Sequence, residues 1–211
     1  METLTPGPAL LPWRLPVALA AGFILGSIPF SIIVARIAGG PDLRRHGTRN
    51  PGATNVWKTI GPIAGVLAGA ADAAKGAAAI WLAWALGLET PAAIWAGVVA
   101  VAGHNWSPFL GFSGGKGGAT MLGALACVLL PELIWVLGIW MVLAFADPRR
   151  RFVWSLVALS AVPLLALMAR GGYLPWVREL APRPYSVILA SALLVAMLWV
   201  RVGPGLRRAH G

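Results

Sequence analysis

The most polar part of the sequence is a segment of fourteen residues, 42–55, between two long apolar runs. It contains three arginines, two threonines and two asparagines, and the asparagines flank a Pro-Gly turn. Arginine together with amide and hydroxyl donors can hold a phosphate from several sides. A loop that only touches lipid headgroups needs cations but no amides, so the asparagines favour a built pocket. The candidate substrate contacts are Arg44, Thr48, Asn50, Gly52, Thr54 and Asn55, followed by Lys58.

A second candidate site is the glycine-rich stretch Gly-Gly-Lys-Gly-Gly at residues 114–118. Backbone N–H groups of glycines can turn toward an anion, the lysine adds a charge, and the helix predicted to follow also attracts phosphate at its start. The stretch is not a Walker A loop, because Gly117 follows the lysine and Leu110 occupies the first glycine position. A tight connection between helices is the alternative interpretation. The candidate contacts are Gly114, Gly115, Lys116, Gly117 and Thr120.

Three titratable residues lie within or at the end of predicted membrane spans. Asp72 and Lys75 are three positions apart and share a helix face, and because charges within a span are costly we predict that they pair and support the polar loop. His104 ends another span and is a further candidate substrate contact; a hydrogen-bonded interfacial residue and a general base both stay open as its role. The sequence has no cluster of metal ligands and a single cysteine, Cys127. We therefore expect no metal, cofactor or internal disulfide.

The elements that position these residues are membrane helices. The chain of 211 residues is 58% hydrophobic and 11% charged, whereas soluble domains average about a quarter charged. Its apolar runs are continuous and do not alternate, which predicts spanning helices and not barrel strands. They leave room for one integral membrane domain over residues 1–211. The net charge of +10 lies mainly in short loops beside the spans, where it sets orientation and does not indicate nucleic acid.

Apolar length predicts an all-α protein with seven transmembrane helices. A Gly-Ser-Ile-Pro sequence predicts a kink in the first span. The run 121–146 could be one helix, which would give six spans, but Pro131-Glu132 near its middle favours two short helices. The predicted spans cover residues 15–38, 61–87, 92–101, 121–146 (divided in two), 153–168 and 185–200, with a polar loop that runs to Lys58 between the first two.

The distribution of basic residues predicts that the N-terminus is outside and the C-terminus is cytoplasmic. With seven spans, 12 of the 17 lysines and arginines fall inside, four fall outside and Lys75 lies within a span. The outside group is Arg14, Arg170, Arg178 and Arg183. This excess follows the positive-inside rule and places the polar loop, the glycine-rich stretch and residues 149–151 on one cytoplasmic face. With six spans residues 149–151 would face outward, so charge also supports the division at Pro131.

Five ordered blocks resemble those of the bacterial acyl-phosphate:glycerol-3-phosphate acyltransferase family (PlsY type). They are Gly-Ser-Ile-Pro at 26–29, Asp-Leu-Arg-x-x-Gly-x-x-Asn-Pro-Gly-Ala-Thr-Asn at 42–55, Asp-x-x-Lys-Gly at 72–76, Gly-His-Asn-x-x-Pro at 103–108 and Phe-x-Gly-Gly-Lys-Gly-x-Ala-Thr at 112–120. The resemblance implies acyl transfer from acyl phosphate to the sn-1 hydroxyl of glycerol 3-phosphate, which yields lysophosphatidic acid and phosphate. It also implies an integral protein of the bacterial inner membrane, a cytoplasmic site and contact with membrane lipids.

The resemblance assigns roles to individual residues. Lys116 would lie against a phosphate and, with Thr48 and Asn50, form the catalytic group, while Asp72, Lys75, Ser155 and Arg201 would support it. The chain departs from the family pattern at several places. Thr48-Arg49 replaces Ser-Gly, Lys58 replaces arginine, Ser155 is displaced by one position, and Val200-Arg201-Val202-Gly203 replaces His-Arg-x-Asn.

Two other functions are compatible with the residues alone. The first is a protein of the same fold that binds lipid phosphate without catalysis or acts on another acceptor. The second is a small transporter or anion channel, although only Asp72 and Lys75 are candidates for charges at mid-membrane and transporters usually need more.

Overall fold

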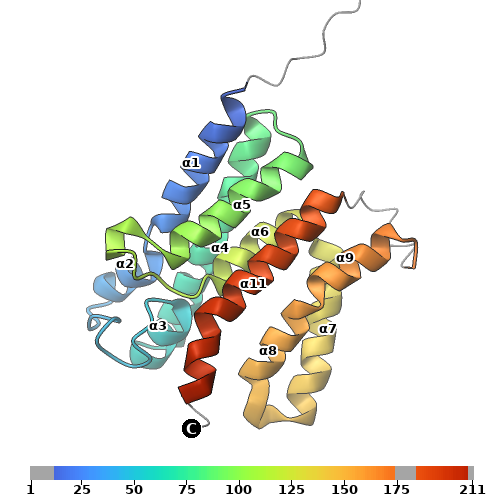
Figure 1. Cartoon of the computed structure of the whole chain (residues 1–211). Coiled ribbons are helices and arrows are strands. Elements are labelled where there is room, and N and C mark those ends of the chain that lie inside the picture. Colours follow the sequence, from blue (N-terminus) through green and yellow to red (C-terminus); the bar gives the residue numbers. More distant parts are fainter. Residues whose placement is uncertain (1–11, 174–183, 209–211) are drawn as a thin grey trace, which may run out of the picture.

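The computed structural model describes residues 12–173 and 184–208, and every regular element in these ranges is a helix, which confirms the all-α prediction there (Figure 1). The α-helices are α1 (Arg14–Ser27), α2 (Phe30–Ile37), α3 (Ala53–Thr59), α4 (Pro62–Ala85), α5 (Thr90–Asn105), α6 (Gly118–Val128), α7 (Leu130–Ala146), α8 (Arg151–Ser160), α9 (Val162–Arg170) and α11 (Tyr185–Arg208). Two short 3-10 helices are η1 (Pro108–Leu110) and η2 (Pro148–Arg150). Arg178 and Arg183, both used in the orientation count, lie outside the described residues.

The first predicted span is broken and not merely kinked. Ile28 adopts an extended conformation between α1 and α2, and Pro29 has no N–H with which to continue the helical bonds. The break takes the Ile28 carbonyl out of the regular helical bonds; it accepts the Phe30 N–H at 3.0 Å and the Lys75 ammonium group at 2.8 Å. The Gly-Ser-Ile-Pro sequence thus creates a backbone acceptor for a buried charge.

The prediction that residues up to Lys58 form a loop is wrong, because Ala53–Thr59 forms helix α3. This helix of seven residues is too short to be stable alone and depends on packing against α4. Val56 is fully buried, and Gly65 leaves room for the backbone of Trp57. A pattern of local propensity does not reveal a helix that tertiary contacts stabilise.

The division of residues 121–146 is confirmed. α6 ends at Val128 and α7 begins at Leu130, so Pro131 occupies the first turn of α7, where its missing N–H costs no helical bond. The predicted span 153–168 is itself interrupted at Ala161, two residues before Pro163, and gives α8 and α9. The final helix continues to Arg208, beyond the predicted end at Val200.

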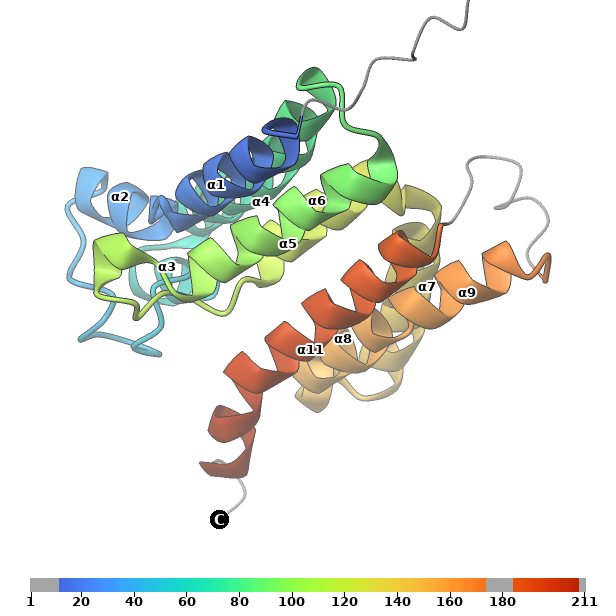
Figure 2. The ribbon, with the colours of Figure 1, turned by 45° about the horizontal axis from the view of Figure 1, so that its top comes forward.

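The helices form two groups that α11 connects (Figures 1 and 2). α1, α4, α5 and α6 pack together, α7, α8 and α9 lie together, and α11 contacts both α5 and α9. The backbones of α4 and α6 touch, since a Cβ on Gly76 would clash with the Thr120 carbonyl and a Cβ on Gly123 with the Ala73 carbonyl. Small residues at crossings are typical of membrane helix pairs. This crossing holds the start of α6 against the polar face of α4.

The surface and the helix lengths are those of an integral membrane protein. Four segments are long and apolar enough to span a membrane, namely Arg14–Ile37, Pro62–Ala85, Val153–Arg170 and Tyr185–Val202, and α6 and α7 are shorter apolar helices. Large apolar side chains such as Ile37, Ile63 and Phe145 are more than three-quarters exposed, as expected of a surface that faces lipid. The number of spans and their orientation stay predictions.

Candidate active site

A cavity of about 340 Å³ lies where the polar loop meets α4, α5, α6 and α11. It is lined by Thr48, Asn50, Gly52, Ala53, Thr54, Lys58, Asp72, His104, Lys116, Gly117, Gly118, Ala119, Leu198 and Val202. The three residues predicted as catalytic, Thr48, Asn50 and Lys116, are therefore brought together from two loops far apart in the sequence. Leu198 and Val202 were not predicted; their spacing of four on α11, with Arg201 between them, is the signal that they share a helix face.

The polar loop between α2 and α3, residues 38–52, is here called the arginine loop, and Asn55 at the start of α3 holds its shape. The Asn55 amide group donates to the carbonyls of Leu43 and His46 at 2.9 and 3.0 Å, and its oxygen accepts the Thr48 N–H at 2.9 Å. Asn55 is fully buried and is not among the cavity-lining residues. The structure thus gives it a structural role in place of the predicted substrate contact, and it positions Thr48.

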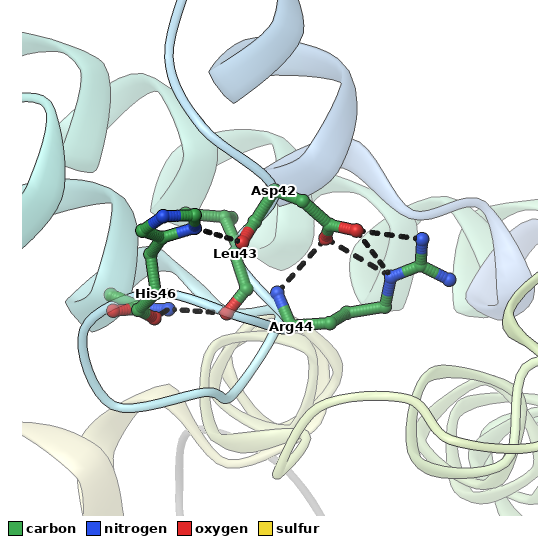
Figure 3. Close-up of polar contacts among 5 residues, drawn as sticks. Asp42, Leu43, Arg44 and His46 are labelled. Carbon is green, nitrogen blue, oxygen red and sulfur yellow. Dashed lines mark hydrogen bonds and ion pairs between the residues drawn. The ribbon is translucent and has the colours of Figure 1, made fainter.

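Arg44, another predicted substrate contact, does not line this cavity. Its guanidinium forms a two-pronged ion pair with Asp42, with Nη2–Oδ2 and Nε–Oδ1 distances of 2.9 and 3.0 Å (Figure 3). The same hydrogen bonds lower the pKa of the Asp42 carboxyl to about 2. Asp42 also accepts a bond from the Arg44 backbone N–H, and its carbonyl lies 3.1 Å from the His46 ring nitrogen. These contacts close the first turn of the arginine loop.

The glycine-rich loop, residues 111–117, is pressed against the end of α5. A Cβ on Gly114 would clash with the His104 carbonyl, and a Cβ on Gly115 would clash with the His104 imidazole. The Gly115 N–H donates to the same carbonyl at 3.1 Å. Arg201 of α11 holds the loop from the other side through bonds of 2.7 Å to the Gly114 carbonyl and 3.1 Å to the Gly115 carbonyl. Close packing therefore explains these two glycines, which do not line the cavity, whereas Gly117 does.

Gly117 turns the chain into α6 with a φ of +76°, a conformation that glycine adopts without strain. Lys116, immediately before it, is half-buried. Burial lowers the pKa of the Lys116 ammonium group below the ordinary lysine value, and the positive charge of Arg201 lowers it further. An anion in the cavity would favour the charged form again, so the site is electrostatically suited to phosphate.

A buried polar cluster borders the cavity, and two of its members, Asp72 and His104, also line it. Asp72 and Lys75 form the predicted ion pair at 2.9 Å, and Ser31 donates to the second Asp72 oxygen at 2.8 Å. The Nδ1 atom of His104 lies 3.6 Å from Asp72 and 3.3 Å from the Thr120 hydroxyl. Thr120 is fully buried and does not contact the cavity. This cluster links α2, α4, α5 and α6, and fixes His104 where the glycine-rich loop packs on it.

A second cavity of about 560 Å³ adjoins the first, and we call it the arginine groove. It is lined by Arg44, Arg49, Asn50, Pro51, Trp106, Ser113, Gly114, Val200 and Arg201. Asn50 lines both cavities. Ser155, predicted as a supporting residue, lies on α8 and lines neither cavity. Within the described residues, no group of three or more His, Cys, Asp or Glu side chains is placed to hold a metal ion.

The cavity is chemically suited to a molecule with a phosphate and an apolar part. Two lysines, Lys58 and Lys116, supply charge; Thr48, Asn50 and Thr54 supply hydroxyl and amide groups. Leu198 and Val202 of α11 provide an apolar wall beside them. The start of α6 adds backbone N–H groups from its first turn, which favour negative charge.

A family model described as glycerol-3-phosphate acyltransferase matches residues 16–209, almost the whole chain. The chain belongs to this family. Among curated members of the glycerol-3-phosphate acyltransferase family, a protein from Moorella thermoacetica is 35% identical over 91% of this chain and 92% of its own length. A protein of the same name from a Synechococcus strain is 44% identical over 79% of this chain and 81% of its own length.

Two solved structures of an integral membrane glycerol 3-phosphate acyltransferase, PlsY, share the fold of this glycerol-3-phosphate acyltransferase family member. The glycerol 3-phosphate form aligns with a TM-score of 0.76 and 28% identity over 92% of this chain and 91% of that chain. The lysophosphatidic acid form aligns with a TM-score of 0.75 and 26% identity over the same shares. The resemblance inferred from five sequence blocks is thus confirmed over nearly the full length.

Proposed function

We propose that this protein transfers an acyl group from acyl phosphate to the sn-1 hydroxyl of glycerol 3-phosphate. The observation that carries the proposal is the convergence of Lys116, Thr48 and Asn50 in one cavity of a chain that belongs to the glycerol-3-phosphate acyltransferase family. The products are lysophosphatidic acid and inorganic phosphate. Both substrates bear phosphate, which agrees with the concentration of cations and amide donors in and beside the cavity.

In the proposed mechanism, the acceptor hydroxyl oxygen attacks the acyl carbonyl carbon, and the bond from that carbon to the phosphate oxygen breaks. The departing phosphate keeps the electron pair, and a substrate phosphate oxygen takes the hydroxyl proton. Lys116 stabilises the charge that builds up on the phosphate, while Thr48 and Asn50 orient the reactants. His104 is not assigned as the base, since its Nδ1 faces Asp72 and Thr120 in the buried cluster.

We further propose seven transmembrane helices in one membrane domain, with the N-terminus outside and the site on the cytoplasmic face of a bacterial inner membrane. The charge count supports this orientation. The arginine loop, η2 and the C-terminal end of α11 also lie toward the same end of the molecule (Figure 1). Labelling of single cysteines in sealed vesicles tests the proposal. If the cysteine of an Arg149→Cys variant were labelled from the side that faces outward in the cell, the proposed orientation would be wrong.

The direct test of the activity uses the purified full-length protein, acyl phosphate and glycerol 3-phosphate. We expect release of inorganic phosphate together with formation of lysophosphatidic acid in equal amounts. Lys116→Ala removes the charge that faces the phosphate and should lower kcat/KM by about 10²–10³, the range seen when one transition-state donor is lost. A folded protein without product, or full activity in Lys116→Ala, would refute the activity or the role of Lys116 respectively.

A second candidate function is acyl transfer to another phosphate-bearing acceptor. It is favoured by the position of Arg49 and Val200, two departures from the family pattern that both line the arginine groove. A competition assay with several polyol phosphates separates the two functions. A higher kcat/KM for another polyol phosphate than for glycerol 3-phosphate would establish the alternative.

A further inference from the structure

The segment between α5 and α6 contains a turn that has no charged side chain. Residues 105–115 include no Asp, Glu, Lys, Arg or His, but they include one tryptophan, two phenylalanines and one leucine. The arginine loop, by contrast, has three arginines, an aspartate and a histidine. Residues 106–112, which overlap the start of the glycine-rich loop, are here called the aromatic turn. Such a composition favours contact with lipid over contact with water.

The aromatic turn directs its polar side chain inward and its rings outward. Ser107 is buried, and its hydroxyl donates to the Ser27 carbonyl at 2.6 Å. Leu110 packs against a buried cluster that includes Ile32 of α2. Phe109 and Phe112 are 62% and 63% exposed. A buried hydroxyl beside exposed aromatic rings is the reverse of the arrangement that water favours.

The depth of the aromatic turn in the membrane follows from its bond to α1. Ser27, whose carbonyl accepts the Ser107 hydroxyl, lies in the candidate span Arg14–Ile37, ten residues before its end. Ten residues of helix cover roughly 15 Å. The yellow-green turn of η1 also lies beside α2, the last part of this span, in both views (Figures 1 and 2). The aromatic turn is therefore level with a segment whose outward side chains, such as Ile37, are apolar and exposed.

The aromatic turn closes its own backbone hydrogen bonds. The N–H groups of four successive residues, 110–113, donate to the carbonyls of residues 107, 108 and 110 at 2.8–3.2 Å. Lipid offers no hydrogen-bond partner, so irregular backbone persists at membrane depth only where its polar groups are bonded within the protein. The turn meets that requirement at these four groups.

Phe112 adopts a backbone conformation that disfavours its side chain. Its φ is +61°, in the left-handed region where a bulky residue is an outlier and glycine is usual. Gly111 before it has a φ of +59°. The turn thus requires two left-handed residues and has glycine at only one of them. Strain of this kind persists where it serves a function, and at Phe112 it places an aromatic ring on the outer surface.

We propose that the aromatic turn lies in the lipid of the leaflet that contains the site, with the rings of Phe109 and Phe112 in contact with lipid chains. The partner is the bilayer itself, at the boundary between headgroups and acyl chains where aromatic rings are favoured. The turn thereby fixes the depth of the glycine-rich loop, whose Lys116 follows Phe112 by four residues. The proposal rests on the fold and on the membrane span, and it does not depend on acyl transfer.

Spin labels measure the depth of the aromatic turn directly. Cys127→Ala provides a background without cysteine, in which Phe109→Cys and Phe112→Cys each receive a nitroxide label. The full-length proteins are placed in liposomes. Electron paramagnetic resonance then measures collisions of the label with oxygen, which concentrates in lipid, and with a nickel chelate, which stays in water. Ile24→Cys on α1 is the lipid reference and Arg45→Cys in the arginine loop is the water reference, because both side chains are exposed.

Labels at residues 109 and 112 should collide with the nickel chelate as rarely as the label at residue 24, and far less often than the label at residue 45. Oxygen should show the opposite order. Collision rates with the nickel chelate that equal the rate at residue 45 would overturn the proposal. Phe109 lies in η1 without a left-handed conformation, so its variant decides the result if Phe112→Cys does not fold.

A charge placed in the aromatic turn provides a second test. Phe109→Asp puts a carboxylate where the proposal places lipid, whereas Phe109→Leu keeps an apolar side chain. The ratio of folded to unfolded protein in bicelles should be about tenfold lower for Phe109→Asp than for Phe109→Leu, because a charge in lipid is unfavourable. The matched pair Arg45→Asp and Arg45→Leu should differ little. Equal ratios for the two Phe109 variants would show that water surrounds the turn, and the proposal would be wrong.

Discussion

The arginine loop and the glycine-rich loop perform similar tasks by different physical means. The arginine loop is held by the buried amide of Asn55, which bonds to three backbone groups, and its own side chains remain largely exposed. The glycine-rich loop is held by close packing on His104 and by Arg201, with almost no room for side chains. The arginine loop can therefore accept a substitution such as Arg49, whereas the glycine-rich loop can accept almost none.

The largest effect should come from a methyl group added to the glycine-rich loop. Gly115→Ala places a Cβ on the His104 imidazole, so the loop must move away from α5, and Lys116 moves with it. We expect a loss of about 3 kcal/mol in the free energy of unfolding, the upper part of the range for overpacking, and a loss of most activity. Thermal unfolding in detergent and kcat/KM measure the two effects.

Gly118→Ala is the matched control for this prediction. The closest atom to a Cβ at Gly118 is Leu198 Cδ1 at 3.9 Å, an ordinary contact, and Gly118 begins a helix that alanine favours. Its stability should be unchanged or higher. Equal losses of kcat/KM in Gly115→Ala and Gly118→Ala would show that the glycines serve phosphate binding and not packing.

A smaller loss of stability is expected when the Asn55 amide, which holds the arginine loop, is removed. Asn55→Ala leaves the Leu43 carbonyl and the Thr48 N–H without their partner and removes one of the two donors to the His46 carbonyl, which should cost about 2 kcal/mol of unfolding free energy. Activity should fall as well, because Thr48 loses its position. Asn50→Ala, which removes an amide from the cavity wall, should reduce activity at nearly unchanged stability. A stable Asn55→Ala protein would contradict the structural role of Asn55.

The pH dependence of activity reports on Lys116. Burial and Arg201 lower its pKa below 10.5, and the charged form is the one that holds phosphate. Activity should therefore be full at neutral pH and fall as the pH rises through this lowered pKa, earlier than for an exposed lysine. In Lys116→Arg the guanidinium stays charged, so any residual activity should lose this alkaline decline. An unchanged decline in that variant would assign it to another group.

The smallest effect is expected at Arg49. Arg49→Gly removes the strain of a positive φ and should raise the free energy of unfolding by up to about 1 kcal/mol. Arg45→Gly, in the same loop at an ordinary φ, should bring no gain. A gain of stability together with lower activity in Arg49→Gly would show that the arginine loop gives up stability for function. A loss of stability would assign Arg49 a structural contact instead.

Most of the helical pattern could be predicted from the sequence, because long apolar runs in a membrane protein must form helices to satisfy their backbone groups. The division near Pro131 followed from proline chemistry and from charge. Helix α3 could not be predicted, since seven residues gain their stability from contact with α4. The break at Ile28 lies next to Pro29, where the sequence predicted only a kink, and the break at Ala161, two residues before Pro163, was not predicted.

The candidate site, like the helices, was predicted from the sequence only in part. The charge count placed the two polar loops on one face, and the family resemblance predicted that Thr48, Asn50, Lys58 and Lys116 belong together; these four residues line one cavity. The sequence could not show which polar residues face the cavity and which support it from behind. Asn55 and Thr120 are polar and adjacent to the motifs, yet both are buried and bonded within the protein.

By itself, the sequence determined that this is a helical membrane protein with two polar loops of phosphate-binding chemistry, because composition and residue type are local properties. Only the tertiary structure decided that Gly114 and Gly115 pack on His104, and that Arg201 reaches their carbonyls from a helix 86 and 87 residues away. It also decided that Arg49 and Val200 face one groove. Such contacts depend on how the helices cross, and helix crossings are set by small residues and packing that no local pattern specifies.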